Sequence, residues 1–240
     1  MKTIQYIKIG ANKYEIYSIS KSNISFRILT TGTLTTEVHS GHAKQNQKSV
    51  NKHDKEALYR YYTGKTMEMK NISALKHGKN NLRFKFRGIK IQVLLPGNDK
   101  SKFQQRSYEG LDVFFVQEKR DKHDIFYTVG GVIQNNKTSG VVSAPILNIS
   151  KEKGEDAFVK GYPYYIKKEK ITLKELDYKL RKHLIEKYGL YKTISKDGRV
   201  KISLKDGSFY NLDLRSKLKF KYMGEVIESK QIKDIEVNLK

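Results

Sequence analysis

The chain lacks cysteine and tryptophan and has only three prolines among its 240 residues. Without cysteine there can be no disulfide, no thiol nucleophile, and no zinc or iron–sulfur site built on thiolates. Three prolines are too few for a proline-rich linker. No stretch approaches the ~18 consecutive apolar residues that a transmembrane helix requires. These absences exclude disulfide-stapled scaffolds, thiol enzymes and proteins with membrane-spanning helices.

Acidic residues are also scarce, with 25 Asp and Glu against 48 Lys and Arg, so the net charge is +23. Such a charge attracts anionic partners, which include nucleic acid, acidic glycans, anionic lipid surfaces and acidic protein surfaces. The basic residues are spread along the chain rather than gathered in a tail. We therefore interpret most of them as the solvated surface of a folded basic protein.

Residues 1–43 have the two ends of a secretion leader but not its middle. The segment starts basic and ends in the small residues Ser40-Gly41-His42-Ala43, where a signal peptidase could cleave. A signal peptide also needs an apolar run of roughly 7–15 residues. Here the run is interrupted by charged side chains, namely Lys13, Glu15, Lys21 and Arg27. We predict that residues 1–43 are an atypical leader-like segment outside the folded core.

Residues 44–150 are predicted to form a small β-barrel of the OB type. Asp54–Gly64 has the pattern of a short helix that ends at a glycine. Apolar residues that alternate with polar ones then predict strands at hairpin spacing. The predicted strands are Met67–Leu75, Asn81–Gly88, Ile89–Leu95, Leu111–Glu118, Ile125–Val132 and Ala144–Ser150. A helix followed by a series of short strands is typical of a twisted OB barrel.

Residues 151–240 are predicted to form a second domain built around one long helix. A capping box at Thr172 and Glu175 marks the start of this helix, and Gly189 marks its end. Its apolar stripe consists of Leu173, Leu176, Leu180 and Leu184. His183 lies between apolar positions of the helix, so we interpret it as a half-buried packing residue.

Strands flank the long helix on both sides. We predict a strand at Tyr162–Glu169, a hairpin at Gly198–Leu214 and a final strand at Asp234–Lys240. Asp206-Gly207 predicts a type I′ turn in the hairpin. One long central helix across a mixed sheet is a β-grasp arrangement. The predicted fold class is therefore α+β, with an N-terminal OB barrel and a C-terminal β-grasp domain.

The sequence contains no pattern typical of a catalytic, metal or cofactor site. None of the six histidines has the spacing of a metal-binding motif. Gly130-Gly131 is not followed by the Gly-Lys-Ser/Thr of a phosphate-binding loop, so a bulge or tight corner is the better interpretation. No serine lies in a nucleophile elbow. We predict that the protein is not an enzyme and needs no cofactor.

A basic strand face suggests a binding surface. Arg83, Lys85 and Arg87 alternate with apolar residues, and Lys90 lies nearby. Single-strand nucleic-acid binders stack bases on aromatic side chains beside their cations. Here Phe84 points towards the predicted core, so the pattern does not favour nucleic acid, although this alternative stays open. We take the four basic residues as a candidate protein-binding surface.

The long helix carries a pattern that resembles the signature of the staphylococcal and streptococcal enterotoxin/superantigen family. The positions that match are Lys168, Ile171, Leu176, Asp177, Arg181, Leu184, Leu190 and Tyr191. The second motif of that family is matched loosely by Val129–Asn136, with its two glycines and a later asparagine. Within the family, the chain is similar to the superantigen-like branch. That likeness covers about residues 44–240 and implies the same two domains as the strand and helix patterns.

The resemblance also implies a function. Superantigen-like proteins are secreted, non-enzymatic binders of host immunoglobulins, complement components, coagulation proteins, receptors or sialylated glycans. Enterotoxins carry a disulfide loop, and some carry a zinc site; the absence of cysteine and of a zinc-like cluster here does not favour superantigen activity. We expect immunoglobulin Fc and complement to be the first targets. Sialylated glycans and anionic surfaces are alternatives, with Thr193, Lys196 and Arg199 as the candidate glycan-binding residues.

Overall fold

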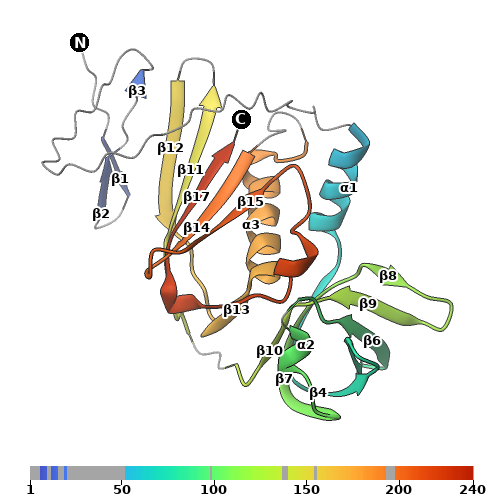
Figure 1. Ribbon diagram of the computed structural model, residues 1–240. Helices are drawn as coiled ribbons and strands as arrows, with labels where there is room; N and C mark the ends of the chain where they lie inside the picture. The colour runs from blue at the N-terminus through green and yellow to red at the C-terminus, as the bar shows by residue number, and fades with distance from the viewer. Residues whose placement is uncertain are drawn as a thin grey trace, which may run out of the picture.

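The computed structural model describes residues 52–97, 99–136, 140–153, 156–192 and 198–239, together with three short strands near the N-terminus. These are β1 (Tyr6–Ile9), β2 (Asn12–Glu15) and β3 (Ile19–Ser20). The rest of the described chain forms two β-rich domains, and helices α1 (Lys52–Thr63) and α3 (Leu173–Tyr188) lie beside the six-stranded sheet of the second domain (Figure 1). The predicted α+β class is thus confirmed.

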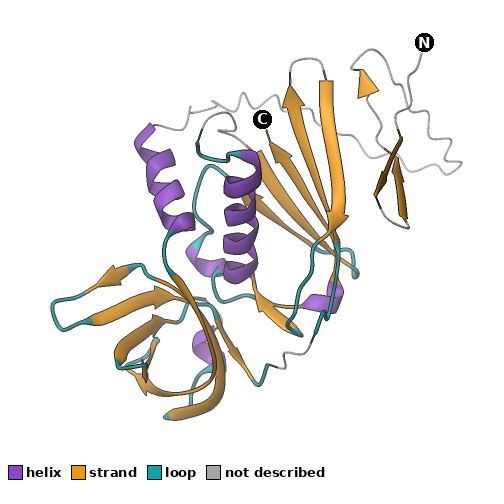
Figure 2. Cartoon of the chain, turned by 180° about the vertical axis from the view of Figure 1, so that it is seen from behind, coloured by secondary structure: helices purple, strands orange, loops and turns teal. Residues whose placement is uncertain are grey.

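The first domain is a strongly curled sheet (Figure 2) with the strand order β10-β7-β4-β5-β6-β9-β8. Its elements are β4 (Thr66–His77), β5 (Asn81–Phe86), β6 (Ile89–Leu94), α2 (Asp99–Lys102), β7 (Ser107–Val116), β8 (Lys119–Arg120), β9 (Ile125–Val129) and β10 (Val132–Gln134). Register shifts on either side of Ile72 mark bulges in β4. Bulges bend a strand, so β4 pairs with β7 along most of its length and with β5 at its end.

The predicted strand Ile125–Val132 is wrong in one respect, because the structure divides it into β9 and β10. Gly130 and Gly131 separate the two strands, with φ values of +57° and +74°. A Cβ atom on Gly130 would lie 2.2 Å from the carbonyl oxygen of Met223, in the second domain. The amide of Gly131 donates to that same oxygen over 3.0 Å. The glycine pair is therefore a tight corner against which the second domain packs.

The second domain has a six-stranded sheet with the order β15-β14-β17-β11-β12-β3. Its strands include β11 (Ile146–Lys153), β12 (Asp156–Pro163), β14 (Gly198–Leu204), β15 (Phe209–Asp213) and β17 (Ile232–Leu239). A small separate sheet pairs β13 (Lys170–Thr172) with β16 (Val226–Glu228), and the 3-10 turns are η1 (Phe220–Tyr222) and η2 (Ser229–Gln231). Helix α3 lies across one face of the larger sheet (Figures 1 and 2).

The structure corrects the expected position of one strand. The segment predicted at Ala144–Ser150 forms β11, which pairs in parallel with β17 through Leu147 and Ile235. It therefore belongs to the second domain rather than to the first, and the expected boundary after residue 150 falls inside it. The segment predicted as a strand at Tyr162–Glu169 contributes only its first two residues to β12. Residues 1–43 are predicted to lie outside the folded core; of these, β3 pairs with β12 at the edge of the six-stranded sheet, and the prediction for the other residues stays a prediction.

The turns of the hairpins also differ from expectation. Around Asp206-Gly207 only the glycine has a positive φ, of +88°, and the amide of Leu204 bonds the carbonyl of Ser208 over 2.8 Å. A type I′ turn needs positive φ at both central residues, so this loop is a longer one. A two-residue turn with both φ values positive occurs instead between β5 and β6, at Arg87 (+47°) and Gly88 (+80°).

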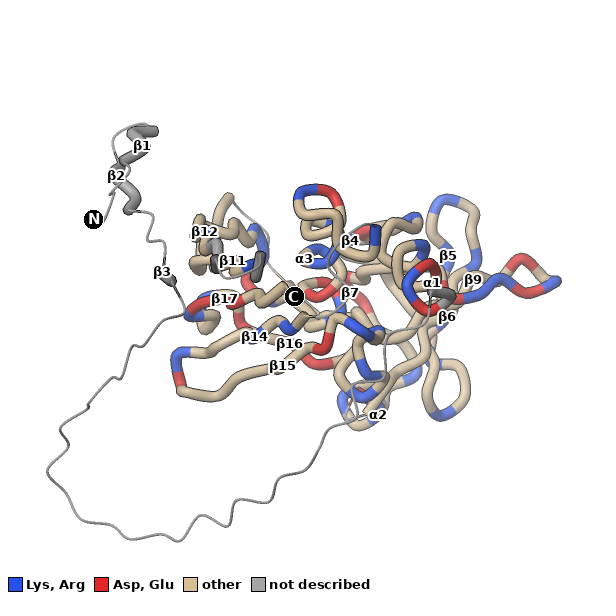
Figure 3. The backbone as a smooth tube through the Cα atoms, turned by 90° about the horizontal axis from the view of Figure 1, so that it is seen from above, with Lys and Arg blue, Asp and Glu red and all other residues tan. Residues whose placement is uncertain are grey.

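Helix α3 begins and ends where the sequence predicts. The Thr172 side chain accepts a hydrogen bond from the amide of Glu175 over 3.2 Å, and Gly189 adopts the left-handed conformation with φ of +69°. The predicted reciprocal bond from Glu175 back to Thr172 is replaced, because the Glu175 carboxylate pairs with Lys168 and Lys179. Basic residues are spread over both domains in the described part of the chain (Figure 3).

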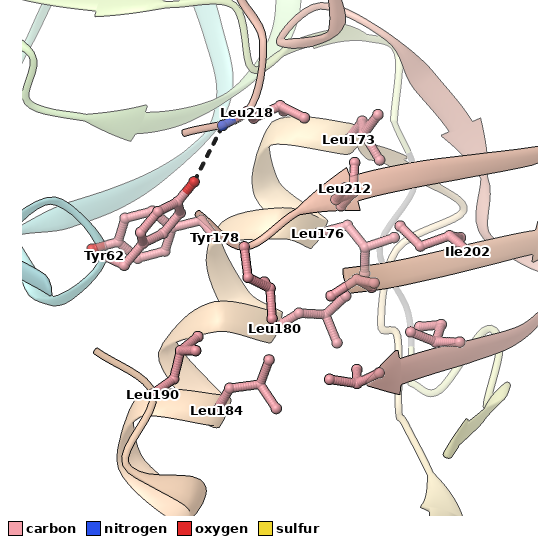
Figure 4. Close-up of a cluster of buried hydrophobic side chains, with 14 of the residues drawn as sticks. Tyr62, Leu173, Leu176, Tyr178, Leu180, Leu184, Leu190, Ile202, Leu212 and Leu218 are labelled. Carbon is pink, nitrogen blue, oxygen red and sulfur yellow. Dashed lines mark hydrogen bonds between the residues drawn. The ribbon is translucent and has the colours of Figure 1, made fainter. Parts of the chain in front are cut away.

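The apolar stripe of α3 lies at the centre of the larger core (Figure 4). Its four leucines are between 0 and 1% exposed. They pack against residues from the sheet that include Ile202 and Leu212 (Figure 4). Burying one such side chain contributes roughly 1.5–3 kcal/mol to folding. The helix therefore organises the second domain through burial.

Candidate functional site

The residues of the helix signature are buried rather than presented to a partner. All eight are between 0 and 8% exposed, namely Lys168, Ile171, Leu176, Asp177, Arg181, Leu184, Leu190 and Tyr191. The apolar members belong to the core around α3. The charged members form two networks within the protein. The geometry thus gives the signature a structural role.

The first network is centred on Arg181, which is 1% exposed. Its Nε atom lies 2.7 Å from Oδ1 of Asp177, and its Nη1 atom donates to the Tyr191 hydroxyl over 2.6 Å. Tyr62 of α1 donates to Oδ2 of Asp177 over 2.7 Å. Burial by itself would lower the pKa of Arg181, but the Asp177 carboxylate beside it raises this pKa above its ordinary value. The network joins α1 to α3.

The second network connects the two domains. Glu68 of β4 pairs with Lys168 over 2.9 Å and with Lys179 over 2.7 Å. Both lysines also pair with Glu175. Burial opposes ionisation of Glu68, but hydrogen bonds from the two lysines outweigh it and lower the pKa of Glu68 to about 2. A cavity of about 240 Å³ adjoins this network, and within the network the two lysines and the two glutamates pair with one another.

Lys174 also crosses between the domains. Its Nζ atom donates to Oγ1 of Thr128 over 2.6 Å and to the carbonyl oxygen of Val129 over 2.7 Å. The side chain comes from α3, whereas both acceptors lie in β9 of the first domain. Burial lowers the pKa of Lys174 to about 7. This amine is therefore partly neutral at physiological pH.

The second family motif likewise contacts the other domain. The side chain of Asn136 donates to the carbonyl of Lys170 and accepts from the amide of Lys170, both over 3.0 Å. Together with the Gly130-Gly131 corner, this places the motif at the junction of the domains. Both motifs that carry the family likeness thus hold the domains and the core together.

The candidate binding surface is a groove of about 730 Å³ in the first domain. The residues that line it are Ser73, Ala74, Leu75, Arg83, Phe84, Lys85, Lys90, Ile91, Ser107, Tyr108, Glu109 and Ile125. Three of the four predicted basic residues are among them: Arg83, Lys85 and Lys90. The fourth, Arg87, lies in the turn at the end of β5.

The groove has an apolar floor and a basic rim. Ala74, Phe84, Ile91 and Tyr108 form the floor and are buried. Leu75 is 61% exposed on the rim. The Nε atom of Arg83 donates to Oε1 of Gln92 over 2.6 Å, which fixes its orientation. Pockets that bind ligands commonly combine an apolar lining with a few polar groups and have volumes of about 300–1,000 Å³.

Sequence reasoning found the basic residues of the groove but missed its apolar part. Leu75 and Tyr108 lie on β4 and β7, whereas Lys85 lies on β5. Leu75 is an apolar residue at an otherwise polar position of β4, and it was the one signal in the sequence for the apolar part of the groove. Only the pairing of the strands brings these residues together.

The remaining predicted residues lie elsewhere. Arg199 is exposed on β14, whereas Thr193 and Lys196 lie outside the described residues, so the glycan site stays a prediction. His183 is half-buried, with ring centroids 5.7 Å from Tyr162 and 6.2 Å from Tyr188. Within the described ranges, no three His, Asp or Glu side chains gather as a metal site would require. No helix there is long and apolar enough to span a membrane.

Comparison with known domain families gives two matches. Residues 56–136 match a family described as Staphylococcal superantigen-like OB-fold domain. Residues 145–239 match a family described as Staphylococcal/Streptococcal toxin, beta-grasp domain. These matches confirm the OB barrel and the β-grasp domain that the sequence patterns predict.

Similar whole proteins are found in Staphylococcus aureus. Staphylococcal superantigen-like 10 of strain Newman is 96% identical over 223 residues, which cover 93% of this chain and 98% of that protein. Staphylococcal superantigen-like 7 of the same strain is 38% identical over 230 residues, covering 94% and 99%.

Solved structures of superantigen-like proteins are also similar to this chain. A crystal structure of Staphylococcal Superantigen-Like protein 10 has a TM-score of 0.76 and 98% identity, and the match covers 78% of this chain and 99% of that one. A structure of SSL5 complexed with sialyl Lewis X has a TM-score of 0.72 and 32% identity, with 78% and 100% covered.

Proposed function

The chain belongs to the staphylococcal superantigen-like family, and on that premise we propose that it is a secreted, non-enzymatic immune-evasion protein. It binds host defence proteins and blocks their function, without the activity of a superantigen. Immunoglobulin Fc and complement are the first expected targets, followed by coagulation proteins and receptors. The choice of these targets rests on the family likeness.

The observation that carries this proposal is the groove of the first domain. It combines an exposed leucine, Leu75, with Arg83, Lys85 and Lys90 in one concave surface. Exposed apolar surface surrounded by polar residues is typical of protein-binding sites. By contrast, the charged residues of the helix signature are buried and satisfied within the protein, so they are not available to a partner.

The charge of the protein favours the same function. A net charge of +23 accelerates association with acidic surfaces through long-range attraction. That attraction is screened by salt, whereas burial of apolar surface in the groove is not. A defined protein partner is therefore expected to remain bound at raised salt.

A second candidate function is the binding of sialylated glycans. It is supported by the solved structure of a relative, SSL5, in complex with sialyl Lewis X. In this chain Arg199 is exposed on β14, and a guanidinium suits the carboxylate of sialic acid. Thr193 and Lys196 complete this candidate site. Single-stranded nucleic acid is less supported, because Phe84 and Tyr108 are 8% and 4% exposed and offer little surface for stacking bases.

The test is a pull-down from human plasma with the immobilised full-length protein. The resin is washed at about 0.15 M salt and then at about twice that concentration, at which the Debye length is shorter. Retained proteins are identified by mass spectrometry. Treating the plasma with sialidase separates glycan recognition from protein recognition.

The proposal expects immunoglobulin, or another defined defence protein, to survive the second wash. Retention of only a diffuse set of acidic proteins, all released by salt, would contradict it. Loss of the partner after sialidase treatment would favour the glycan function instead. Arg199→Ala tests that alternative directly, because it removes the guanidinium expected to contact sialic acid.

A further inference from the structure

The groove lies where two strands of the first domain separate. The pairing of β4 with β5 ends at Leu75 and Arg83, whereas β5 remains paired with β6 as far as Phe86 and Ile89. On the N-terminal side of Leu75, β4 is bulged and is paired with β7 but no longer with β5. In the described part of the chain, no strand therefore pairs with β5 on its groove side from Phe84 onwards. An unpaired strand edge is a template for an additional strand.

The side chains around this edge fall into two layers. Phe84 is 8% exposed and belongs to the floor, whereas Arg83 and Lys85 lie on the opposite face of β5. Successive side chains of any added strand would also alternate between two faces. Its inward side chains would contact the apolar floor, which includes Tyr108. Its outward side chains would lie beside Arg83 and Lys85, within about 4.5–5.5 Å between Cβ atoms.

The outer layer carries more positive than negative charge. Lys85 and Lys90 are directly opposite each other in the β5–β6 pair. Like charges in that position destabilise a sheet, and neither lysine forms an ion pair with a described residue. Against the cations Arg83, Lys85 and Lys90, the groove contains a single acidic residue, Glu109. A partner with acidic side chains on its outer face would relieve this repulsion.

We propose that the groove binds an extended segment of a host protein in which aliphatic and acidic residues alternate, and that this segment joins β5 as an added strand. Main-chain hydrogen bonds to β5 give affinity, and the alternation gives specificity. The inference rests on the proposed function, because it names the chemistry by which the first domain recognises its target.

The test measures fluorescence anisotropy of the full-length protein with a short fluorescein-labelled peptide in which Val and Glu alternate. A peptide of the same length in which Val and Lys alternate is the charge control. A third peptide keeps the Val and Glu side chains, but every second backbone amide is methylated, so that it cannot pair as a strand. Laurate, an anionic amphiphile without a backbone, is the fourth probe.

Two variants test whether the peptide binds in the groove. Lys85→Glu reverses a charge on the rim, and Leu75→Lys replaces the exposed leucine. Lys182→Glu is the matched control, because Lys182 is equally an exposed lysine but lies on α3 in the other domain. Circular dichroism checks that all three fold. Because the substituted side chains are exposed, folding is expected to be unaffected.

The inference expects saturable binding of the Val–Glu peptide and none of the Val–Lys peptide. It expects methylation and Lys85→Glu each to weaken the affinity by about tenfold or more, which is about 1.4 kcal/mol. The Lys182→Glu control should bind as the wild type does. Equal binding of the methylated peptide, or an equal effect of Lys182→Glu, would overturn the inference. So would laurate binding as tightly as the peptide.

The two proposals can fail separately. If a plasma protein is retained equally by the wild type and by Lys85→Glu, the proposed function stands and the groove inference is wrong. If the peptide binds as expected but plasma yields no defined partner, the groove inference stands and the proposed function is wrong.

Discussion

Replacing Lys174 by methionine should change how the stability of the protein depends on pH. Lys174 is buried between the domains and donates to Thr128 and Val129. Burial lowers its pKa to about 7; Glu118 opposes this shift and Lys217 adds to it. In the unfolded chain a lysine has a pKa of about 10.4. Between these two values the unfolded state binds the proton more tightly, so the folded state gains stability as pH rises.

The magnitude follows from the shift. Stability should rise by up to about 1.4 kcal/mol per pH unit while Lys174 is protonated only in the unfolded state. Between pH 7 and pH 9, the free energy of unfolding should therefore rise by about 2 kcal/mol in total. The rise is smaller than the maximum because Lys174 is still partly protonated in the folded state near pH 7. Methionine has a similar length and does not titrate, so Lys174→Met should lack this gain.

The assay is urea-induced unfolding of both proteins at several pH values between about 6.5 and 9, followed by circular dichroism and extrapolated linearly. Other titrating groups contribute equally to both proteins and cancel in the difference. Lys182→Met is the control, because it makes the same chemical change at an exposed position of the same helix. Its pH profile should run parallel to that of the wild type. If Lys174→Met also ran parallel, the reasoning about the buried amine would be refuted.

Three further predictions concern stability. Arg181→Leu should lower the free energy of unfolding by about 3–5 kcal/mol, because it leaves the buried Asp177 carboxylate without its cation; thermal denaturation with no loss would contradict the structural role of the signature. Gly130→Ala should lower the free energy of unfolding by about 2–4 kcal/mol, through its positive φ and its contact with the second domain. Gly78 also has a positive φ, of +61°, but no atom lies within 4 Å of an added Cβ, so Gly78→Ala should lose only the stability that the strained backbone costs. Equal losses in the two variants would count against the contact. Burial raises the pKa of Asp99 to about 6, although Lys102 opposes this shift. Because the pKa of Asp99 is higher in the folded than in the unfolded state, the free energy of unfolding falls as pH rises through about 6. Asp99→Asn should therefore be more stable than the wild type at pH 7.5 but not at pH 4, and calorimetry at the two pH values checks this.

Local patterns in the sequence determined much of this protein. The capping threonine, the leucine stripe and Gly189 predict α3, because caps and helical periodicity depend on residues within a few positions of one another. The alternation around Phe84 predicts β5 and its two faces for the same reason. The Gly130-Gly131 pair predicts a tight corner, because only glycine readily adopts that backbone conformation.

Tertiary structure alone decided the features that depend on distant partners. β11 joins the second domain because it pairs with β17, and no local pattern distinguishes that partner from a strand of the barrel. Glu175 bonds lysines rather than Thr172, because folding brings Lys168 beside it. The floor of the groove exists only once β4 and β7 lie opposite β5 and β6. Periodicity specifies which face of a strand is apolar, but strand pairing specifies which faces meet, and the groove results from that pairing.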